Sequence, residues 1–546
     1  MGTKSIRTVL VMSCTLPAVL AGAPGAVLGQ TALPIRRVAA PAATGPRLGS
    51  ADFTPSPDRP VGWRGDGTGR FPAATPPIAW ERKQAGADYA TKGIVWMTPL
   101  PNTSVSSPII VGDRIFVTAE VSDLVCLDKR TGRVLWIRSN PEFEGVPAAD
   151  RKDNPAYVRA LDPLVPQLVK ANADAVKTLN ALRPTAAARP AGPPAPALVR
   201  KRELDKQIYK LERSADRKRF DRNWAQEVFG FSGPTPTSDG AHVYVFFTTG
   251  VVACYDLEGN RKWINRGGTG MSEHGNFASP LLCENRLVVW AAEIRGYDSG
   301  TGKLLWTNPA EGGNTYGSLF RICAGNEQVA AFQSGYFARI SDGKPIWGER
   351  VFGDAVATPI VQEHFVFAWV GYPRNSEKLG FKAYRVPAST EGKWPAAAYA
   401  FAVDWASDQL PEDKKHPFER SYTASPLCVD GLIYQMTQGG GLTVHDAATG
   451  EPVYRKVLSM KPRTEYWGWA GASASPTLAG NYVFLMDNQG TTIVIKPGKR
   501  YVEVAHNVIE ECGDGKTQVQ NVSTPIFEGT RMYYRTPGYL YCIGDE

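Results

Sequence analysis

Short apolar runs separated by turn residues recur along the chain from residue 94 to its end. In the clearest copy, Ile109-Ile110 is followed by a Gly112-Asp113 turn and then by the apolar runs 115–117 and 125–127. Short runs bounded by Gly, Asp and Asn are typical of β-strands joined by tight turns. The pattern therefore predicts a chain built of many short strands.

These runs are grouped into a repeated unit. The fullest unit opens with Ser107-Pro108 and closes with Thr131-Gly132 and Trp136. Proline opens a strand without having to donate a ladder hydrogen bond, and the closing Trp is large enough to pack between neighbouring sheets. Further units begin at Thr235, Ser279, Gly317-Ser318, Thr358, Ser425, Ser475 and Thr524.

The spacing of the units predicts an eight-bladed β-propeller. Pro236 and Pro280 lie 44 residues apart, and the steps from Pro426 through Pro476 to Pro525 are 50 and 49 residues. These steps are close to the ~40–50 residues of a four-stranded blade. The eight unit starts therefore predict eight blades.

The two ends of the repeat array complement each other. The last unit ends without a Trp strand, whereas Ile94-Val95-Trp96-Met97 stands alone before the first unit. We expect this strand to pair with the last unit and close the ring, which removes the exposed sheet edges. An open array of hairpins or a pair of sandwiches would leave both partial units unpaired.

An insertion over residues 140–230 separates the first two units. Leu204, Ile208 and Leu211 recur at helical spacing, and a second stripe, interrupted by prolines, runs over 158–182. Such stripes are typical of amphipathic helices. We therefore predict an antiparallel helical hairpin that stands on one face of the propeller.

Most of the net positive charge falls on the second of these helices. Residues 200–222 contain ten Lys or Arg and five Asp or Glu, against a net charge of +8 for the whole chain. Such a helix is either a solvated face with internal ion pairs or a site for an acidic partner or anionic lipid. We expect no nucleic-acid partner, because such a role would require that the chain is not exported.

The N-terminus predicts export to the periplasm or cell envelope. Residues 1–30 have the form of a signal peptide, with Lys4 and Arg7 before an apolar run and small residues after it. No later stretch approaches the ~20 apolar residues of a membrane span. Residues 31–90 are expected to be an Ala- and Pro-rich leader and linker, and residues 91–546 the propeller.

Two of the units carry a family resemblance. Leu127-Asp128 with Thr131-Gly132-Arg133-Val134-Leu135-Trp136, and Tyr297-Asp298 with Thr301-Gly302-Lys303-Leu304-Leu305-Trp306, resemble the pyrroloquinoline quinone (PQQ) repeat. This resemblance to exported quinoprotein-like and BamB-like propellers implies an all-β fold. The expected fold class is an eight-bladed quinoprotein-like β-propeller with an inserted α-helical hairpin.

The resemblance leaves two functions open. It includes PQQ-dependent dehydrogenases, in which the quinone stacks on a disulfide of adjacent cysteines beside Ca²⁺, and assembly proteins that are not enzymes. Adjacent cysteines, a Cys-x-x-Cys-His haem motif, paired-Cys zinc spacing and a Gly-x-Ser-x-Gly elbow are absent from this sequence. We therefore predict a binding or scaffold protein of the cell envelope with protein partners and without a cofactor or metal. The alternative is a PQQ- and metal-dependent alcohol or sugar dehydrogenase with Ca²⁺.

Candidate binding residues precede the unit starts, because the loops that enter the innermost strands meet at the channel mouth. Asp354 or Glu273 would act as a base or cation ligand, and Arg420 would bind a carboxylate. Trp467 or Trp469 would stack on a planar ring. Alternatively, these residues bond to one another or form a rim that binds a peptide. The candidates are Glu273, His274, Asn276, Asp354, Arg420, Tyr422, Tyr466, Trp467 and Trp469.

The cysteines are predicted to be mostly buried free thiols. Cys126, Cys254 and Cys542 occupy the same apolar strand position in different units. Equivalent positions in different blades have similar packing environments, so we expect buried free thiols, with at most a minority of the cysteines paired.

Overall fold

A computed structural model describes residues 45–546, apart from 87, 153, 186–194, 218, 221–229, 267, 269–276, 292, 310–315, 349, 354–355, 372–379, 403–422, 461, 463–470, 511–522 and 546. The chain divides into two compact units, Met1–Arg37 and Val38–Glu546. All described residues belong to the second unit, so the predicted signal peptide lies outside them.

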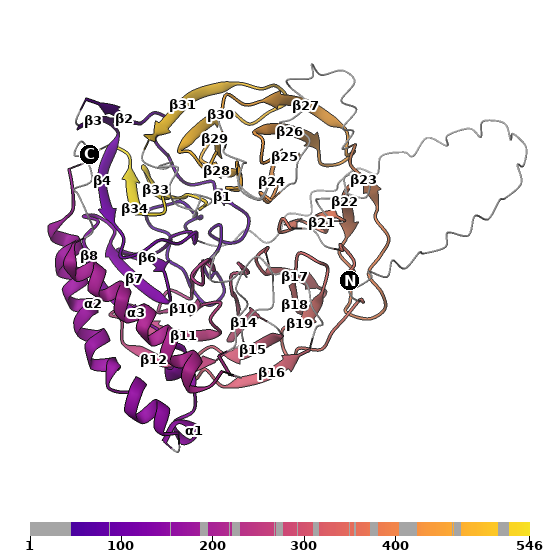
Figure 1. The fold of residues 1–546 in the computed structure, drawn as a ribbon. Helices are drawn as coiled ribbons and strands as arrows, with labels where there is room; N and C mark the ends of the chain where they lie inside the picture. The colour runs from indigo at the N-terminus through magenta and orange to yellow at the C-terminus, as the bar shows by residue number, and fades with distance from the viewer. Residues whose placement is uncertain are drawn as a thin grey trace, which may run out of the picture. The chain divides into compact units, whose positions relative to one another are not determined.

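The described strands form eight sheets arranged as the blades of a β-propeller (Figure 1). We number the sheets in chain order of their innermost strands. Sheet 1 contains β5 (Ile109–Val111), β6 (Arg114–Ala119), β7 (Asp123–Asp128) and β8 (Val134–Ser139); sheet 2 contains β9 (Thr237–Ser238), β10 (His242–Phe246), β11 (Val251–Asp256) and β12 (Arg261–Arg266). Sheet 3 contains β13 (Leu281–Cys283), β14 (Arg286–Trp290), β15 (Ile294–Asp298) and β16 (Leu304–Asn308); sheet 4 contains β17 (Phe320–Ala324), β18 (Glu327–Ala331) and β19 (Phe337–Arg339).

The second half of the chain repeats this arrangement. Sheet 5 contains β20 (Ile360–Gln362), β21 (Phe365–Val370), β22 (Gly380–Arg385) and β23 (Tyr399–Ala400); sheet 6 contains β24 (Leu427–Val429), β25 (Leu432–Met436), β26 (Gly441–Asp446) and β27 (Pro452–Val457). Sheet 7 is built on β28 (Thr477–Ala479), β29 (Tyr482–Met486), β30 (Thr491–Ile495) and β31 (Glu503–Ile509), and sheet 8 on β32 (Ile526–Glu528), β33 (Arg531–Arg535) and β34 (Tyr539–Ile543). The sheets follow the predicted units one for one. The blade count of the complete ring stays a prediction, because ranges outside the described residues separate several sheets.

The strand before the first unit completes sheet 8. β4 (Ile94–Pro99) pairs antiparallel with β34, placing Trp96 opposite Cys542 and Met97 opposite Tyr541. This pairing confirms the predicted partner of the 94–97 strand. The ends of the repeat array therefore share one sheet.

A chain of hydrogen bonds joins the first residues of the units. The backbone N–H of Ser107 donates to Thr235 Oγ1, and the same contact recurs from sheet to sheet as far as Ser475; Thr524 then donates to Ser107 Oγ. These seven bonds measure 2.8–3.3 Å. In seven of the eight units the opening hydroxyl thus accepts a hydrogen bond from the N–H of the preceding sheet, which explains why Ser or Thr occupies this position.

The closing Trp of one unit packs against a glycine of the next. A Cβ atom on Gly132 would lie 2.6 Å from the Trp96 ring, and one on Gly302 would lie 2.5 Å from Trp263. The Trp263 indole N–H also donates to the Ser299 carbonyl at 2.9 Å. A side chain in place of either glycine would displace the indole, so the Thr-Gly turn and the Trp form one interlocking contact.

Residues 45–93, which we call the N-terminal strap, are part of the propeller and not the leader expected over 31–90. β1 (Arg70–Phe71) pairs parallel with β28, and β2 (Glu81–Ala85) pairs parallel with β31 and antiparallel with β3 (Asp88–Lys92). Phe71 and Trp80 are buried. The high Ala and Pro content conceals these aromatic anchors in the sequence, because the strap packs through a few large residues.

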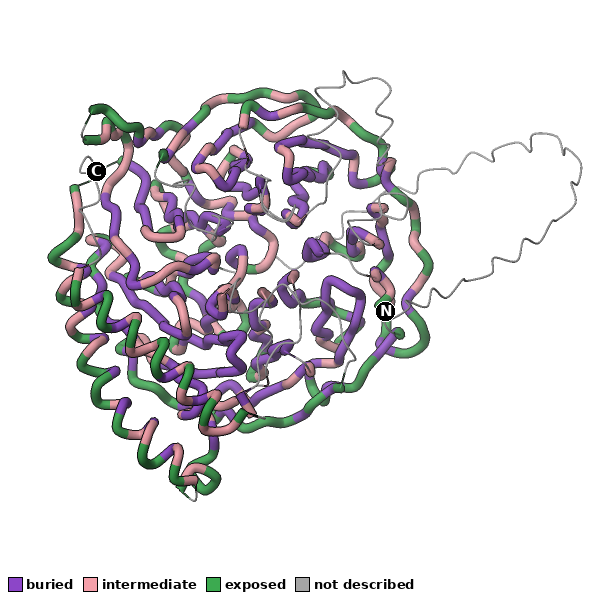
Figure 2. The backbone as a smooth tube through the Cα atoms, in the orientation of Figure 1, coloured by how far each residue is buried: buried purple, intermediate pink, exposed green. Residues whose placement is uncertain are grey.

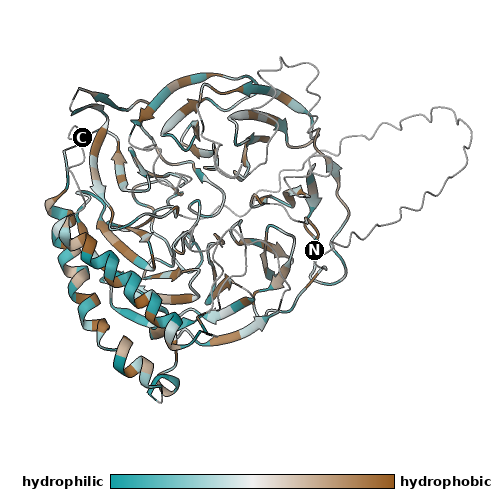
Figure 3. Cartoon of the chain, in the orientation of Figure 1, coloured by the Kyte–Doolittle hydropathy of each residue, from teal (hydrophilic) through white to brown (hydrophobic). Residues whose placement is uncertain are grey.

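The insertion contains the predicted helical hairpin. It consists of η1 (Glu142–Gly145), α1 (Ala148–Lys152), η2 (Tyr157–Leu161), α2 (Leu164–Ala181) and α3 (Pro196–Ala215). The hairpin lies along the outer edge of sheet 1 and not on a face of the propeller as predicted (Figures 1 and 3). Asn180 binds the edge of β8, accepting from the Val134 N–H and donating to its carbonyl, both at 2.9 Å. The hairpin therefore covers an otherwise open strand edge.

Within the described residues, no helix combines the length and the apolar character needed to cross a bilayer.

Candidate binding site at the mouth of the propeller

The mouth is defined here as the end of the propeller at which the innermost strands begin. The predicted site residues of this end, Glu273, His274, Asn276, Asp354, Arg420, Tyr422, Tyr466, Trp467 and Trp469, all lie outside the described residues. Their convergence stays a prediction. Tyr316, on the loop that enters sheet 4, is described and half-buried.

A second set of polar residues lies at the same end. In each sheet the second strand runs antiparallel to the first, so it ends where the first begins. Buried polar side chains gather at these strand ends, which is unusual for a region that is otherwise apolar. They are Thr118, Thr248, Thr249, Gln333, Ser334, Thr437, Gln438, Asp487, Asn488, Arg535 and Thr536.

Glu120, just after β6, holds the chain where the insertion returns to sheet 2. Its carboxylate accepts hydrogen bonds from the Phe231 N–H at 2.9 Å, the Ser232 N–H at 2.8 Å and the Ser232 hydroxyl. Burial raises the pKa of Glu120 to about 7, although these hydrogen bonds oppose the shift. The carboxylate therefore serves as an anchor for the 231–232 backbone.

Arg535, the last residue of β33, links sheet 8 to sheet 1. Its Nη1 donates to Ser106 Oγ at 3.0 Å and to the Thr118 carbonyl at 2.6 Å. The side chain is fully buried, and this burial lowers the pKa of Arg535 to about 9, so it stays charged at neutral pH. Nε and Nη2 are buried without a hydrogen-bond partner among the described residues.

A cluster of hydroxyls connects these two charged groups. Thr118 Oγ1 lies 2.6 Å from both Ser106 Oγ and the Ser232 carbonyl, and Ser104 Oγ donates to that carbonyl at 2.9 Å. Because Ser106 also binds Arg535, sheets 8, 1 and 2 are tied together at the mouth.

Arg64 connects the N-terminal strap with the beginnings of two innermost strands. The N-terminal strap crosses the end at which the innermost strands finish, and its Arg64 side chain is fully buried. Nη1 donates to the Pro426 carbonyl at 3.0 Å and Nη2 to the Pro476 carbonyl at 2.8 Å. Pro426 directly precedes β24 and Pro476 directly precedes β28, so this guanidinium binds the beginnings of sheets 6 and 7. Burial lowers the pKa of Arg64 to about 9.

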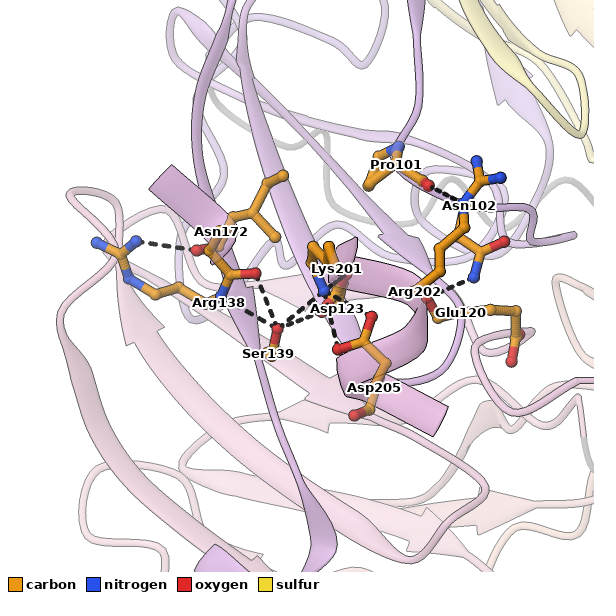
Figure 4. A network of polar contacts seen from close by, with 12 residues as sticks. Pro101, Asn102, Glu120, Asp123, Arg138, Ser139, Asn172, Lys201, Arg202 and Asp205 are labelled. Carbon is orange, nitrogen blue, oxygen red and sulfur yellow. Dashed lines mark hydrogen bonds and ion pairs between the residues drawn. The ribbon is translucent and has the colours of Figure 1, made fainter. Parts of the chain in front are cut away.

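A second polar network lies beside the mouth, between the hairpin and sheet 1 (Figure 4). Lys201 Nζ lies 2.7 Å from Asp123 Oδ2 and 2.8 Å from Asp205 Oδ2, and it donates to Ser139 Oγ at 3.3 Å. The Lys201 and Asp123 side chains are each 2% exposed. Burial opposes the charged form, but the two carboxylates hold the pKa of Lys201 above its ordinary value. This network fixes α3 to β7 and β8.

The cysteines at the repeated strand position are buried free thiols. Cys126 lies opposite Trp136, Cys254 opposite Trp263 and Cys542 opposite Trp96. Burial raises the pKa of Cys254 to about 12. These thiols therefore behave as small apolar side chains beneath the packing Trp.

The described residues were also tested against a quinone and metal site. They contain no group of three or more His, Cys, Asp or Glu side chains placed to hold a metal ion. Glu120 already accepts hydrogen bonds from the 231–232 backbone, and Asp487, the carboxylate of the mouth set, accepts hydrogen bonds from the Gln489 and Thr491 N–H groups. The described part of the mouth does not fit a quinone–metal pair by itself.

Comparison with known proteins places the chain in a family. The profile of the family described as outer membrane protein assembly factor BamB matches residues 37–164 and 291–543. The chain belongs to this BamB family. The unmatched range between them contains α3 and sheet 2 of this BamB-family chain. No curated protein matches the chain in sequence.

Three solved structures are similar to parts of this chain. BamB from Moraxella catarrhalis is 13% identical, and the match covers 57% of this chain and 81% of that one with a TM-score of 0.40. Quinohemoprotein alcohol dehydrogenase from Comamonas testosteroni is 13% identical, and the match covers 83% of this chain and 76% of that one with a TM-score of 0.44. The computationally designed protein Ika8 is 11% identical, and the match covers 83% of this chain and 100% of that one with a TM-score of 0.46.

The described mouth residues were missed by the sequence analysis because only the loops before the unit starts were considered. Glu120 follows the second strand of its sheet and Arg535 is the last residue of the second strand of its own, and the antiparallel arrangement places these ends at the mouth as well. A polar residue directly after the second apolar run of each unit is the signal that would have found them.

Proposed function

We propose that this chain is a binding protein of the cell envelope that holds a protein partner at the mouth of its propeller. Membership of a family described as an outer membrane protein assembly factor supports a role in the envelope. The partner would contact the rim through loops or an added strand, as propellers and other β-folds do.

The observation that carries this proposal is that two charged groups in the described part of the mouth are held by other segments of the chain. Glu120 is occupied by the 231–232 backbone, and Arg535 bridges two sheets. Charged groups held in this way stabilise a rigid rim, whereas a reacting acid or base must reach its substrate. A rigid rim loses little conformational entropy when a partner binds, which favours binding as its role.

Site-specific photocrosslinking tests this proposal. A photoreactive phenylalanine replaces Tyr316 at the mouth or, as a matched control, Tyr482, which is half-buried at the opposite end of sheet 7. We expect a discrete adduct with an envelope protein at position 316 only, and excess unlabelled protein should suppress it. Equal adducts at both positions, or none at 316, would contradict a partner at the mouth.

The proposal includes no quinone and no metal. PQQ and Ca²⁺ added to the purified chain should therefore change neither its melting temperature nor dye-linked oxidation of alcohols and sugars. A rise in melting temperature together with dye reduction would support the dehydrogenase alternative instead. This result is independent of the crosslinking experiment, so the two functions are tested separately.

A further inference from the structure

Half of the exposed large hydrophobic side chains in the described part of the chain lie in the insertion. Eight large hydrophobic side chains are exposed, and four of them, Val158, Val169, Leu182 and Val199, belong to the insertion. Val169 on α2 is 66% exposed, the largest value of the eight. Val169 and Val199 lie on α2 and α3, and Leu182 directly follows α2, so exposed apolar side chains accompany both helices of the hairpin.

The same surface is strongly basic. The exposed charged side chains of α2 and α3 are five cations, Lys170, Lys177, Arg200, Lys206 and Lys210, and one acid, Glu203, while Asp174 is partly exposed. Lys170 and Lys206 form ion pairs with acids of their own helices. In the described part of the chain, Lys177, Arg200 and Lys210 form no ion pair. The outward side of the hairpin therefore carries positive charge that the protein itself leaves unbalanced.

The hairpin cannot turn this side inward, because its opposite side is fixed to sheet 1. Leu168, Leu179 and Leu198 are buried there, together with the Lys201 and Asp123 ion pair. Figure 2 shows the resulting division, with buried positions towards the propeller and exposed ones away from it. The exposed basic and apolar positions of α2 and α3 therefore lie on the sides of these helices that do not pack against sheet 1.

We propose that this outward side of α2 and α3 docks the propeller onto an anionic lipid surface. Lys and Arg extend their charged ends to lipid phosphates while their aliphatic stems and the intervening valines contact the acyl boundary. An acidic protein is the less suitable occupant. Protein interfaces are usually anchored by aromatic side chains, whereas Tyr209, the aromatic residue of α3, packs against Phe231. The docking does not depend on what the mouth binds.

Vesicle co-sedimentation tests the proposal with the full chain, whose residues 1–44 are identical in every variant. The probes are phosphatidylcholine vesicles with and without 30 mol% phosphatidylglycerol. The triple variant Lys177→Gln, Arg200→Gln, Lys210→Gln removes the unpaired cations. The matched control Lys303→Gln, Lys499→Gln, Arg500→Gln removes two Lys and one Arg that are exposed elsewhere on the propeller.

We expect binding only to the vesicles that contain phosphatidylglycerol, and binding should weaken as salt is added. Each cation near an anionic surface contributes about fivefold in affinity, so the hairpin triple variant should bind on the order of 100-fold more weakly. Val169→Ser should weaken binding further, and the control triple should bind like the wild type.

Three results would overturn the proposal. The first is binding that ignores phosphatidylglycerol. The second is an equal loss of binding in both triple variants, which would indicate that the net charge of the protein, and not the hairpin, determines binding to the vesicles. The third is tight binding of a soluble acidic protein through these residues without vesicle binding, which would assign the surface to a protein.

Discussion

Buried charged side chains fix the joints between the parts of this propeller. Lys201 joins the hairpin to sheet 1, Arg535 joins sheet 8 to sheet 1, and Arg64 joins the N-terminal strap to sheets 6 and 7. A buried charge is tolerated only where carboxylates or carbonyl oxygens replace its water. Each of these residues therefore specifies the position at which its two parts meet.

Lys201 provides the clearest test of this role. Replacing it by Met would leave the buried Asp123 carboxylate without its cation, which costs about 3–5 kcal/mol in comparable buried pairs. Lys206→Met on the same helix removes an exposed pair and should cost about 1 kcal/mol or less. Chemical unfolding of both variants measures the difference. If the two variants are equally stable, the buried network does not hold the hairpin.

Asp205 makes the stability of this joint depend on pH. Burial, with the nearby Asp123 charge, raises the pKa of Asp205 above its ordinary value, although Lys201 opposes the shift. The folded state therefore binds this proton more tightly than the unfolded state. Its contribution to stability is complete below the unfolded pKa and is lost as the pH rises through the folded pKa.

The variant Asp205→Asn removes this titration. Its unfolding free energy relative to wild type should therefore rise between pH 5 and pH 8, and chemical unfolding at a series of pH values measures it. Glu203→Gln, an acid-to-amide change on the exposed side of α3, is the matched control variant. Parallel pH profiles for wild type and Asp205→Asn would show that the carboxylate does not titrate in this range.

At the scale of elements, the sequence predicted what repeats and missed what occurs once. The strands, the packing Trp and the strand pairing of Trp96 follow from a local pattern copied along the chain. The hairpin was also predictable, because Leu204 and Ile208 repeat at helical spacing. The position of the hairpin along the outer edge of sheet 1 was not predictable, because it depends on the contact between Lys201 and Asp123. Nothing local in the sequence distinguishes Lys201 from the other cations of α3.

The candidate site was predictable only in part for a similar reason. The loops before the unit starts are marked by the Ser/Thr-Pro motif, which led to the candidates outside the described residues. Glu120 and Arg535 belong to no motif, and their roles arise from contacts with the distant Phe231 and Thr118. Single contacts between remote segments leave no period in a sequence.

The hydroxyl that opens each unit makes a prediction about how neighbouring sheets are joined. Ser279→Ala removes the acceptor of the Thr235 N–H, a bond of 3.0 Å in a buried position. An unsatisfied buried N–H costs about 1–3 kcal/mol. Ser279→Thr keeps the hydroxyl that other units use and should cost less than Ser279→Ala. Thermal unfolding compares the two, and equal losses would show that side-chain size and not the hydrogen bond matters here.

At the scale of the whole molecule, two separate features hold the sheets together. β4 closes the ring by completing sheet 8, and the N-terminal strap spans several sheets from one end. Val61 bridges to Ser238 of sheet 2, Arg70 Nη1 donates to Gln362 of sheet 5 at 3.2 Å, and the Thr75 N–H donates to the Gly529 carbonyl beside sheet 8 at 2.8 Å. Because repeat proteins depend on contacts between neighbouring repeats, a segment that links distant sheets makes the ring more cooperative.

Arg64 allows this cooperativity to be tested with one residue. Arg64→Leu keeps the bulk of the side chain but leaves the Pro426 and Pro476 carbonyls without their donor. Hydrogen bonds to a charged group contribute about 1.5–3 kcal/mol each, so amide exchange in β24 and β28 should become at least tenfold faster. Arg59→Leu, in an exposed part of the strap with a bond to the Pro46 carbonyl, is the control and should leave these amides unchanged. If exchange in Arg64→Leu accelerates only within the strap, the strap is a local cover, and the closure of the ring rests on β4 alone.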